Sequence, residues 1–163
     1  MWVFLYFLLT ENSCFILYCY IFYLKHMFTP NHLHLIVKWT FRNPPITTDA
    51  LNTWFVDLVK KVRMVVVAGP TSVYVADEGN EGVTGTVTLA TSHASMHVWE
   101  KMEPPMFQFD IYSCSSFTSS EVIEHLDYFG LLSYEFIFLD RNDGINIIES
   151  GKKENILKDT TES

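Results

Sequence analysis

Two amphipathic segments with helical spacing, set among runs whose apolar residues alternate, constrain the fold of this chain more than any other feature. The first predicts a helix over residues 50–62, with apolar positions Leu51, Trp54, Phe55, Leu58 and Val62. The second begins at the capping box Thr118-x-x-Glu121 and ends at Gly130. Its apolar stripe consists of Val122, Ile123, Leu126 and Phe129.

The alternating runs between and around these helices predict strands. Strands are expected from Asn31 to the Pro44-Pro45 pair and over 64–68, 73–75, 83–90, 93–99, 107–112 and 134–139. The runs 83–90 and 93–99 are also compatible with one continuous strand through Ser92. The acidic segment 77–82 predicts a hairpin loop. Clustered strands with two helices predict an α+β fold, a two-layer sandwich with an antiparallel-dominated sheet and both helices on one face.

The first 26 residues differ from the rest of the chain because they are almost entirely apolar, with Glu11 and Lys25 as their charged residues. Three interpretations are open: upstream sequence before a true start at Met27, a membrane helix, or a secretory signal. The chain is therefore divided into an N-terminal extension (1–26), one domain (27–140) and a polar C-terminal tail (141–163) that is expected to fray.

Charge and cysteine content narrow the class of protein. The 163-residue chain has a net charge of −8, which argues against a nucleic-acid partner because such proteins carry a basic surface. Its three cysteines do not form an even disulfide framework, and they suit a reducing, cytoplasmic compartment.

The segment from Thr91 to Trp99 carries the richest chemistry. On a strand, His93, Ser95, His97 and Trp99 share one face, opposite Ala94, Met96 and Val98. Three interpretations remain from the residues alone: a zinc site of His93, His97 and Cys114, a nucleophile paired with histidine, or ordinary surface histidines around a small buried cysteine. His32 and His34, which alternate on the first strand, are expected to be exposed.

Three segments together resemble the bacterial-type S-adenosylmethionine decarboxylases. They are Gly82-Val83-Thr84-Gly85, the stretch from Ala90 to Glu100, and Phe109-Asp110-Ile111-Tyr112-Ser113-Cys114. That family carries a Gly-Val-Ser-Gly turn, then Glu-Ser-His-x-Ser-x-His-Thr-Trp-Pro-Glu, then Asp-x-Phe-Thr-Cys-Gly. The resemblance covers about residues 31–140, and the family's two-layer α+β fold matches the predicted order of elements.

The resemblance implies an autocatalytically processed lyase that is made as a zymogen. The Ser92 hydroxyl would attack the carbonyl of Thr91, and cleavage between Thr91 and Ser92 would leave a pyruvoyl group derived from Ser92, with no metal. That group would form a Schiff base with S-adenosylmethionine and accept the electrons released by decarboxylation, in polyamine (spermidine) biosynthesis. The family also implies a homodimer of processed chain pairs with sites at the interface.

The resemblance also assigns roles to individual residues. Cys114 corresponds to the proton donor, and His97 and Thr84 correspond to the histidine and serine that assist processing. Trp99 corresponds to an aromatic ring that stacks on adenine. Tyr74 corresponds to the opposite wall of that site, and Glu100 to a ribose-binding glutamate.

Departures from the family pattern keep other functions open. Thr91 replaces the glutamate before the cut, Ser115 replaces the glycine after the cysteine, and residues 101–105 lengthen the turn after Trp99. The alternatives are a pyruvoyl-dependent ornithine or arginine decarboxylase on the same fold and an unprocessed, non-catalytic regulatory or binding relative. A membrane-attached protein that uses residues 1–26 as its anchor is a further alternative.

Overall fold

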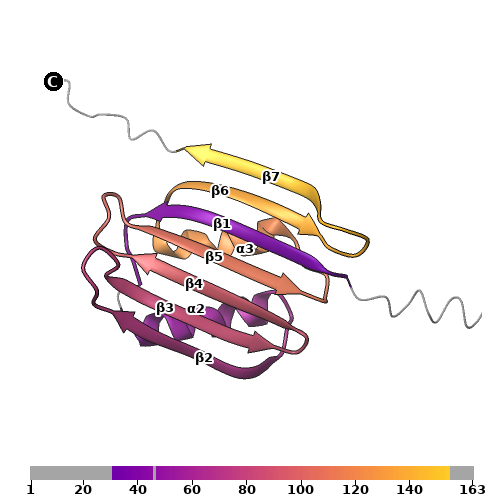
Figure 1. Cartoon of the computed structure of the whole chain (residues 1–163), viewed down its shortest axis with the longest axis horizontal. Coiled ribbons are helices and arrows are strands. Elements are labelled where there is room, and N and C mark those ends of the chain that lie inside the picture. The colour runs from indigo at the N-terminus through magenta and orange to yellow at the C-terminus, as the bar shows by residue number, and fades with distance from the viewer. Residues whose placement is uncertain (1–30, 46, 155–163) are drawn as a thin grey trace, which may run out of the picture. The chain divides into compact units, whose positions relative to one another are not determined.

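A seven-stranded antiparallel sheet, covered on one face by two helices, forms the part of the chain that the computed structural model describes, residues 31–45 and 47–154 (Figure 1). The strands are β1 (Leu33–Phe41), β2 (Val66–Val75), β3 (Gly82–Leu89), β4 (Ser92–Trp99), β5 (Met106–Ser113), β6 (Leu131–Asp140) and β7 (Asn146–Glu154). The helices are α2 (Thr48–Lys61) and α3 (Ser119–Leu126), followed by the short 3-10 helix η1 (Asp127–Phe129). The predicted α+β two-layer fold is confirmed.

The strand order in the sheet is β2-β3-β4-β5-β1-β6-β7. Strand β1, the first of these in sequence, therefore lies in the interior of the sheet, between β5 and β6. Leu35 on β1 is opposite Ile111 on β5 and Phe138 on β6, and these apolar side chains belong to the hydrophobic core. The alternation predicted from Asn31 onward is thus the alternation of a central strand with one buried face.

Helix α2 covers the sheet with the apolar stripe predicted for residues 50–62. Its N-cap is Thr47, whose side-chain oxygen accepts a hydrogen bond from the backbone N–H of Ala50 at 3.2 Å. The buried side chains of the helix are Leu51, Trp54, Phe55, Leu58 and Val59. Gly85 on β3 allows this close approach, because a Cβ at that position would lie 2.8 Å from Leu51 Cδ2.

Helix α3 begins at the predicted capping box but ends at Leu126, and the short helix η1 continues to the predicted terminator Gly130. The capping box of Thr118 and Glu121 is present in full, and a cap of this kind stabilises a helix by about 1 kcal/mol. Gly130 follows η1 in the left-handed conformation, with φ of 71°, and its N–H bonds to the carbonyl of Asp127 at 2.9 Å. The predicted terminator is therefore confirmed in place and in mechanism.

Two strand boundaries differ from those expected. Residues 64–68 and 73–75 were expected to form separate strands, but one strand, β2, runs through Gly69-Pro70 with shifts of register on either side. The continuous strand through Ser92, an alternative for residues 83–99, is excluded because Ala90 and Thr91 form a turn between β3 and β4.

The expectation that the chain frays from Arg141 is wrong for residues 146–154. These residues form β7, which pairs antiparallel with β6 from Asn146 to Glu154. Almost all side chains of β7 are exposed, so the strand lacks the alternation that identifies a strand with one buried face. Its backbone hydrogen bonds to β6 hold it in the sheet instead.

No helix among the described residues is long and apolar enough to cross a membrane. The three interpretations of residues 1–26 lie outside the described residues.

Candidate active site

The turn between β3 and β4 places a strained peptide next to a buried serine. Leu89 and Ser92 pair across the turn, and Ala90 and Thr91 form its two central residues. Thr91 has a φ of 64°, in the left-handed region. A β-branched residue there is strained by roughly 1–2 kcal/mol, because its Cβ crowds the carbonyl oxygen. The strained residue is the one predicted to precede the cut.

Cys114 contacts the hydroxyl and the carbonyl group that would react in self-cleavage. Its backbone N–H donates to Ser92 Oγ at 3.2 Å, and its thiol donates to the carbonyl oxygen of Thr91 at 3.1 Å. Ser92 is only 9% exposed, and its hydroxyl also donates to the carbonyl of Ala90 at 3.5 Å. A donor on the carbonyl oxygen stabilises the negative charge that develops there when a hydroxyl attacks the carbon. Ser92, Thr91 and Cys114 are thus brought together as expected.

Tyr112 and His32 complete the surroundings of the Cys114 thiol, and the sequence analysis assigned neither of them a role. The Tyr112 hydroxyl lies 3.4 Å from Cys114 Sγ and 2.6 Å from His32 Nδ1. His32 Nδ1 is itself 3.6 Å from the sulfur. His32 was expected to be exposed, but it is partly buried with its ring stacked on Tyr112. The hydrogen bond to Cys114, followed by burial, raises the pKa of Tyr112.

A cluster of ionisable groups continues from Tyr112 across the sheet face that faces away from the helices. Asp110 accepts a short hydrogen bond from Ser95, and its carboxylate lies 3.6 Å from both His34 Nε2 and His93 Nε2. Burial raises the pKa of Asp110, but the contacts with His34 and Ser95 and the charge of His93 together outweigh burial and hold it below its usual value. The Arg141 guanidinium lies 4.8 Å from the centre of the Tyr112 ring.

Thr84, His97 and Trp99 form a second cluster around a cavity of about 240 Å³. Thr84 and His97 are cross-strand partners on β3 and β4, and Thr84 Oγ1 lies 3.2 Å from His97 Nδ1. The indole N–H of Trp99 donates to Asn80 Oδ1 at 3.4 Å, which ties the ring to the acidic loop. The two residues to which the resemblance assigns processing roles therefore contact each other, beside the partly buried ring of Trp99.

Tyr74 and Glu100 are brought to each other rather than to Trp99. The Tyr74 hydroxyl donates to Glu100 Oε1 at 2.7 Å, and this hydrogen bond, with some burial, raises the pKa of Tyr74. Tyr74 is opposite Val83, which faces the helices, whereas Trp99 shares the other sheet face with His97. In one chain these two rings therefore do not form opposing walls of a single adenine site.

The two clusters lie at opposite ends of β4. Ser92 opens that strand, and His97 lies five residues later, so their side chains point to opposite faces. At about 3.3 Å per residue, roughly 16 Å of strand separates them. Figure 1 shows the β3–β4 turn and the end of β5 at one end of the sheet, and the start of β3 at the other. Thr84 and His97 are therefore not brought to Ser92 within one chain.

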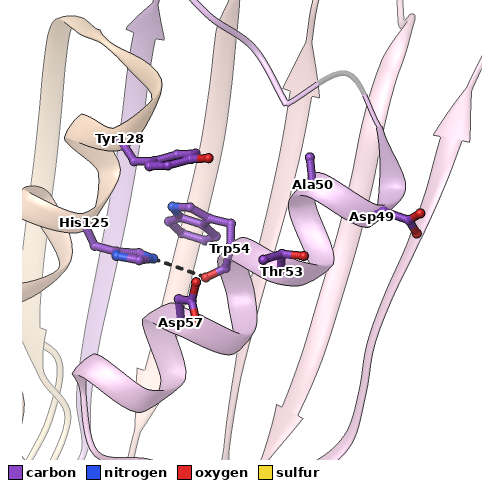
Figure 2. Close-up of a pocket in the computed structure, with 7 residues that line it drawn as sticks. All are labelled: Asp49, Ala50, Thr53, Trp54, Asp57, His125 and Tyr128. Atoms are coloured by element: carbon purple, nitrogen blue, oxygen red, sulfur yellow. Dashed lines mark hydrogen bonds between the residues drawn. The ribbon is translucent and has the colours of Figure 1, made fainter.

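A separate pocket lies between the two helices, away from every predicted site residue. Its volume is about 290 Å³, and its lining comprises Asp49, Ala50, Thr53, Trp54, Asp57, His125 and Tyr128 (Figure 2). His125 Nε2 lies 3.2 Å from the backbone carbonyl of Trp54, and burial lowers the pKa of His125. Within the described ranges, no group of three or more His, Cys, Asp and Glu side chains is placed to hold a metal ion.

Comparison with known proteins identifies the family. No curated protein matches the chain. The family model of S-adenosylmethionine decarboxylase matches residues 39–142, a range that contains Ser92, Cys114 and the Thr84–His97 pair. This range is more than half of the chain and includes both ends of β4. The chain therefore belongs to the S-adenosylmethionine decarboxylase family.

Proposed function

We propose that this protein cleaves itself between Thr91 and Ser92 and then decarboxylates S-adenosylmethionine for spermidine biosynthesis. The observation that carries the proposal is the position of Cys114, which donates hydrogen bonds to Ser92 Oγ and to the carbonyl oxygen of Thr91. The first atom is the nucleophile of the cleavage, and the second is the oxygen that gains negative charge when the Thr91 carbonyl carbon is attacked. The left-handed strain at Thr91 adds a reason for this peptide to react.

The residues present fit the formation of a pyruvoyl group from Ser92. Ser92 Oγ forms a bond to the Thr91 carbonyl carbon and the peptide C–N bond breaks, which converts the amide into an ester. Loss of the Ser92 Cα proton then breaks the ester C–O bond and releases Thr91 as a carboxylate. Addition of one water and loss of ammonia leave the new N-terminus as pyruvoyl. The thiol of Cys114 stabilises the oxyanion in the first step.

The pyruvoyl group supplies an electron sink for the loss of carbon dioxide. The remaining work falls to side chains of the chain itself. Once cleavage removes the Thr91 carbonyl, the Cys114 thiol is free to donate its proton to the substrate carbon that has lost carbon dioxide. Trp99 offers a partly exposed aromatic surface for the adenine ring, with its orientation set by the hydrogen bond to Asn80.

A homodimer with sites at the subunit interface follows from the separation of the two clusters. In one chain, His97 is too far from Ser92 to take part in its chemistry, because roughly 16 Å of strand separates them. In a two-fold dimer built on the helix-free sheet face, we expect the Thr84–His97 cluster of one copy to lie against the β3–β4 turn and Cys114 of the other. Among the described residues, no helix covers that face (Figure 1).

An intact mass spectrum of the purified full-length protein tests the proposal. We expect two fragments split between Thr91 and Ser92, the second lacking the mass of an intact N-terminal serine. Ser92→Ala should give one uncut, inactive chain. Ser116→Ala, which changes an exposed serine near the site, should be cleaved like the wild type.

Two results would overturn the proposal in different ways. An uncut wild-type chain after long incubation would favour the unprocessed regulatory or binding relative, which the replacement of the family's glutamate by Thr91 already suggests. A cut chain that releases carbon dioxide from ornithine or arginine, and not from S-adenosylmethionine, would keep the cleavage and change the substrate.

A further inference from the structure

Three polar side chains form a closed triangle at the end of β5. The Cys114 sulfur, the Tyr112 hydroxyl and His32 Nδ1 are separated by 3.4 Å, 2.6 Å and 3.6 Å. All three distances are within hydrogen-bonding range for oxygen and nitrogen or for sulfur. Each group exchanges protons, so the triangle is a connected path between the thiol and a partly exposed imidazole.

The sheet register fixes this path. Tyr112 on β5 is opposite His34 on β1, and His32 lies two residues before His34 on the same side of the chain. The backbone of His32 is held at both ends, since its N–H donates to Asn142 Oδ1 at 3.2 Å and its carbonyl accepts from the N–H of Arg141 at 2.7 Å. The imidazole is thus held in position against the hydroxyl.

The proposed cleavage does not use the path formed by Tyr112 and His32. In the uncut chain the thiol donates to the Thr91 carbonyl, and neither Tyr112 nor His32 is needed for that contact. Tyr112 also departs from the motif that the chain resembles, which carries phenylalanine at this position. His32 precedes the matched family region, which begins at residue 39. Neither the proposed cleavage nor the family motif therefore explains the position of these two residues.

We propose that Tyr112 and His32 form a proton relay that reprotonates Cys114 after each turnover, which rests on the proposed decarboxylase function. When the thiol has given its proton to the substrate carbon, the Tyr112 O–H transfers its proton to the sulfur. The phenolate oxygen then takes the Nδ1 proton of the His32 imidazolium. Neutral His32 regains a proton from water, so the cycle consumes one solvent proton and no oxidant or reductant.

The charges around the relay suit a thiolate that exists only briefly. Arg141 is the residue that follows β6, and its guanidinium carbon lies 4.8 Å from the centre of the Tyr112 ring. The rings of His34 on β1 and His93 on β4 also pack against Tyr112, and both lie near the Asp110 carboxylate. The fixed positive charge of Arg141 stabilises an anion on sulfur or on the phenolic oxygen while the proton moves.

Two variants test the relay, and each has a direct readout. Tyr112→Phe keeps the ring and its packing but removes the hydroxyl, and His32→Ala removes the imidazole. Both should still cleave themselves, because the contacts among Ser92, Thr91 and Cys114 remain. We expect kcat to fall about tenfold in each, as for loss of a positioned proton donor, and added imidazole to restore His32→Ala in particular. Tyr128→Phe, on the exposed helix face, is the matched control.

Alkylation of Cys114 by iodoacetamide gives a readout that does not depend on turnover. The rate, measured by mass spectrometry on the peptide that contains Cys114, should fall several-fold in both variants because the reactive thiolate loses hydrogen-bond donors that stabilise it. The peptide readout separates Cys114 from Cys14 and Cys19. Tyr128→Phe should react at the wild-type rate.

The outcomes separate the relay from the proposed function. A cut, active protein whose kcat and alkylation rate are unchanged in both variants would overturn the relay alone. Failure of imidazole to restore His32→Ala would overturn the assignment of His32 as the solvent end. An uncut wild-type chain would overturn the proposed function and the relay with it, whatever the alkylation rates.

Discussion

The two ends of β4 are built on different physical principles. At the Ser92 end, the groups that matter are buried or half-buried and held by backbone atoms, with Thr91 in a strained conformation. At the His97 end, Thr84 and His97 contact each other through side chains alone, beside a cavity of about 240 Å³. The first end is already assembled in one chain. The second end has its own residues paired but has no reactive centre nearby.

This difference between the two ends of β4 matches the different roles proposed for them. Under the proposed function, the cleavage chemistry lies on one hairpin and the end of its neighbouring strand. In the proposed dimer, the residues at the other end of β4 would act on that chemistry from a second copy. The predictions below separate these two ends, and they run from the largest expected effect to the smallest.

The largest effect is expected when the two ends are inactivated in different chains. Full-length Ser92→Ala and His97→Ala should each be inactive alone. When they are co-expressed, about a quarter of the wild-type sites should become active, because half of the dimers are mixed and one site in each mixed dimer has both groups. Decarboxylation by the co-purified mixture, normalised to protein, measures this recovery.

A matched pair distinguishes exchange between subunits from general rescue. Ser92→Ala and Cys114→Ala damage the same end, so each site of a mixed dimer contains one damaged group. Their mixture should stay inactive. If Ser92→Ala and His97→Ala also fail to restore each other, the two ends do not meet across a dimer interface.

A smaller effect is expected from the strain at the Ser92 end. Thr91→Gly removes the Cβ that makes a φ of 64° unfavourable. In the uncut Ser92→Ala background, we expect the free energy of unfolding to rise by about 1 kcal/mol, as measured by urea denaturation. With Ser92 intact, the same change should slow self-cleavage, because the relaxed peptide starts lower in energy.

Arg63→Gly is the control for this prediction. Arg63 is the other described residue with a left-handed φ outside glycine, at 58°, and it follows α2, far along the chain from Ser92. This variant should be cleaved at the wild-type rate. Equal slowing in Thr91→Gly and Arg63→Gly would mean that strain at the cut has no specific part in cleavage.

The smallest effect concerns the helix layer and should leave both ends intact. Burial lowers the pKa of His125, so between about pH 5 and about pH 7.5 the unfolded chain binds more protons than the folded one. The stability gained from neutral His125 is therefore present above the ordinary pKa of histidine and is lost as the pH falls. His125→Gln, whose amide can still donate to the Trp54 carbonyl, should flatten this dependence.

Unfolding midpoints of wild type and His125→Gln across that pH range measure the difference. Cleavage at neutral pH should be equal in the two proteins, since no residue that lines the helix pocket belongs to β4. A parallel pH dependence in the two proteins would contradict the role given to His125.

The sequence predicts those elements in which the spacing of apolar, polar and capping residues reflects burial or a helix end. The capping box at Thr118, the stripe of α2 and the face shared by His93, Ser95, His97 and Trp99 are all read from spacing, and the structure bears them out. Strand β7 is missed because its exposed side chains carry no alternation, and its place depends on backbone pairing with β6 and on distant contacts such as the Ser119–Glu149 hydrogen bond. The break between the strands expected over 83–90 and 93–99 is confirmed, and the alternative of one continuous strand through Ser92 is wrong.

The candidate site divides in the same way. The motifs around Ser92 and Cys114 could be recognised as local patterns, so those residues were predicted. The contact of His32 and Tyr112 with Cys114 depends on the register of β1 against β5, which joins residues about eighty positions apart in the chain. No local pattern reports a contact of that length. The distance from His97 to Ser92, by contrast, follows from their spacing once both residues are placed on β4.

The place of β1 in the sheet determines how the two fragments would be held together after the proposed self-cleavage. The cut at Thr91–Ser92 puts β1, α2, β2 and β3 in one piece and β4, β5, α3, β6 and β7 in the other. Because β1 is inserted between β5 and β6, and β3 stays paired with β4, the two pieces are interlaced. The two fragments would stay associated under native conditions and separate only in denaturant. Refolding from denaturant would then be bimolecular, because two separate fragments must associate. The cleaved protein would therefore refold less readily than the uncut chain folds.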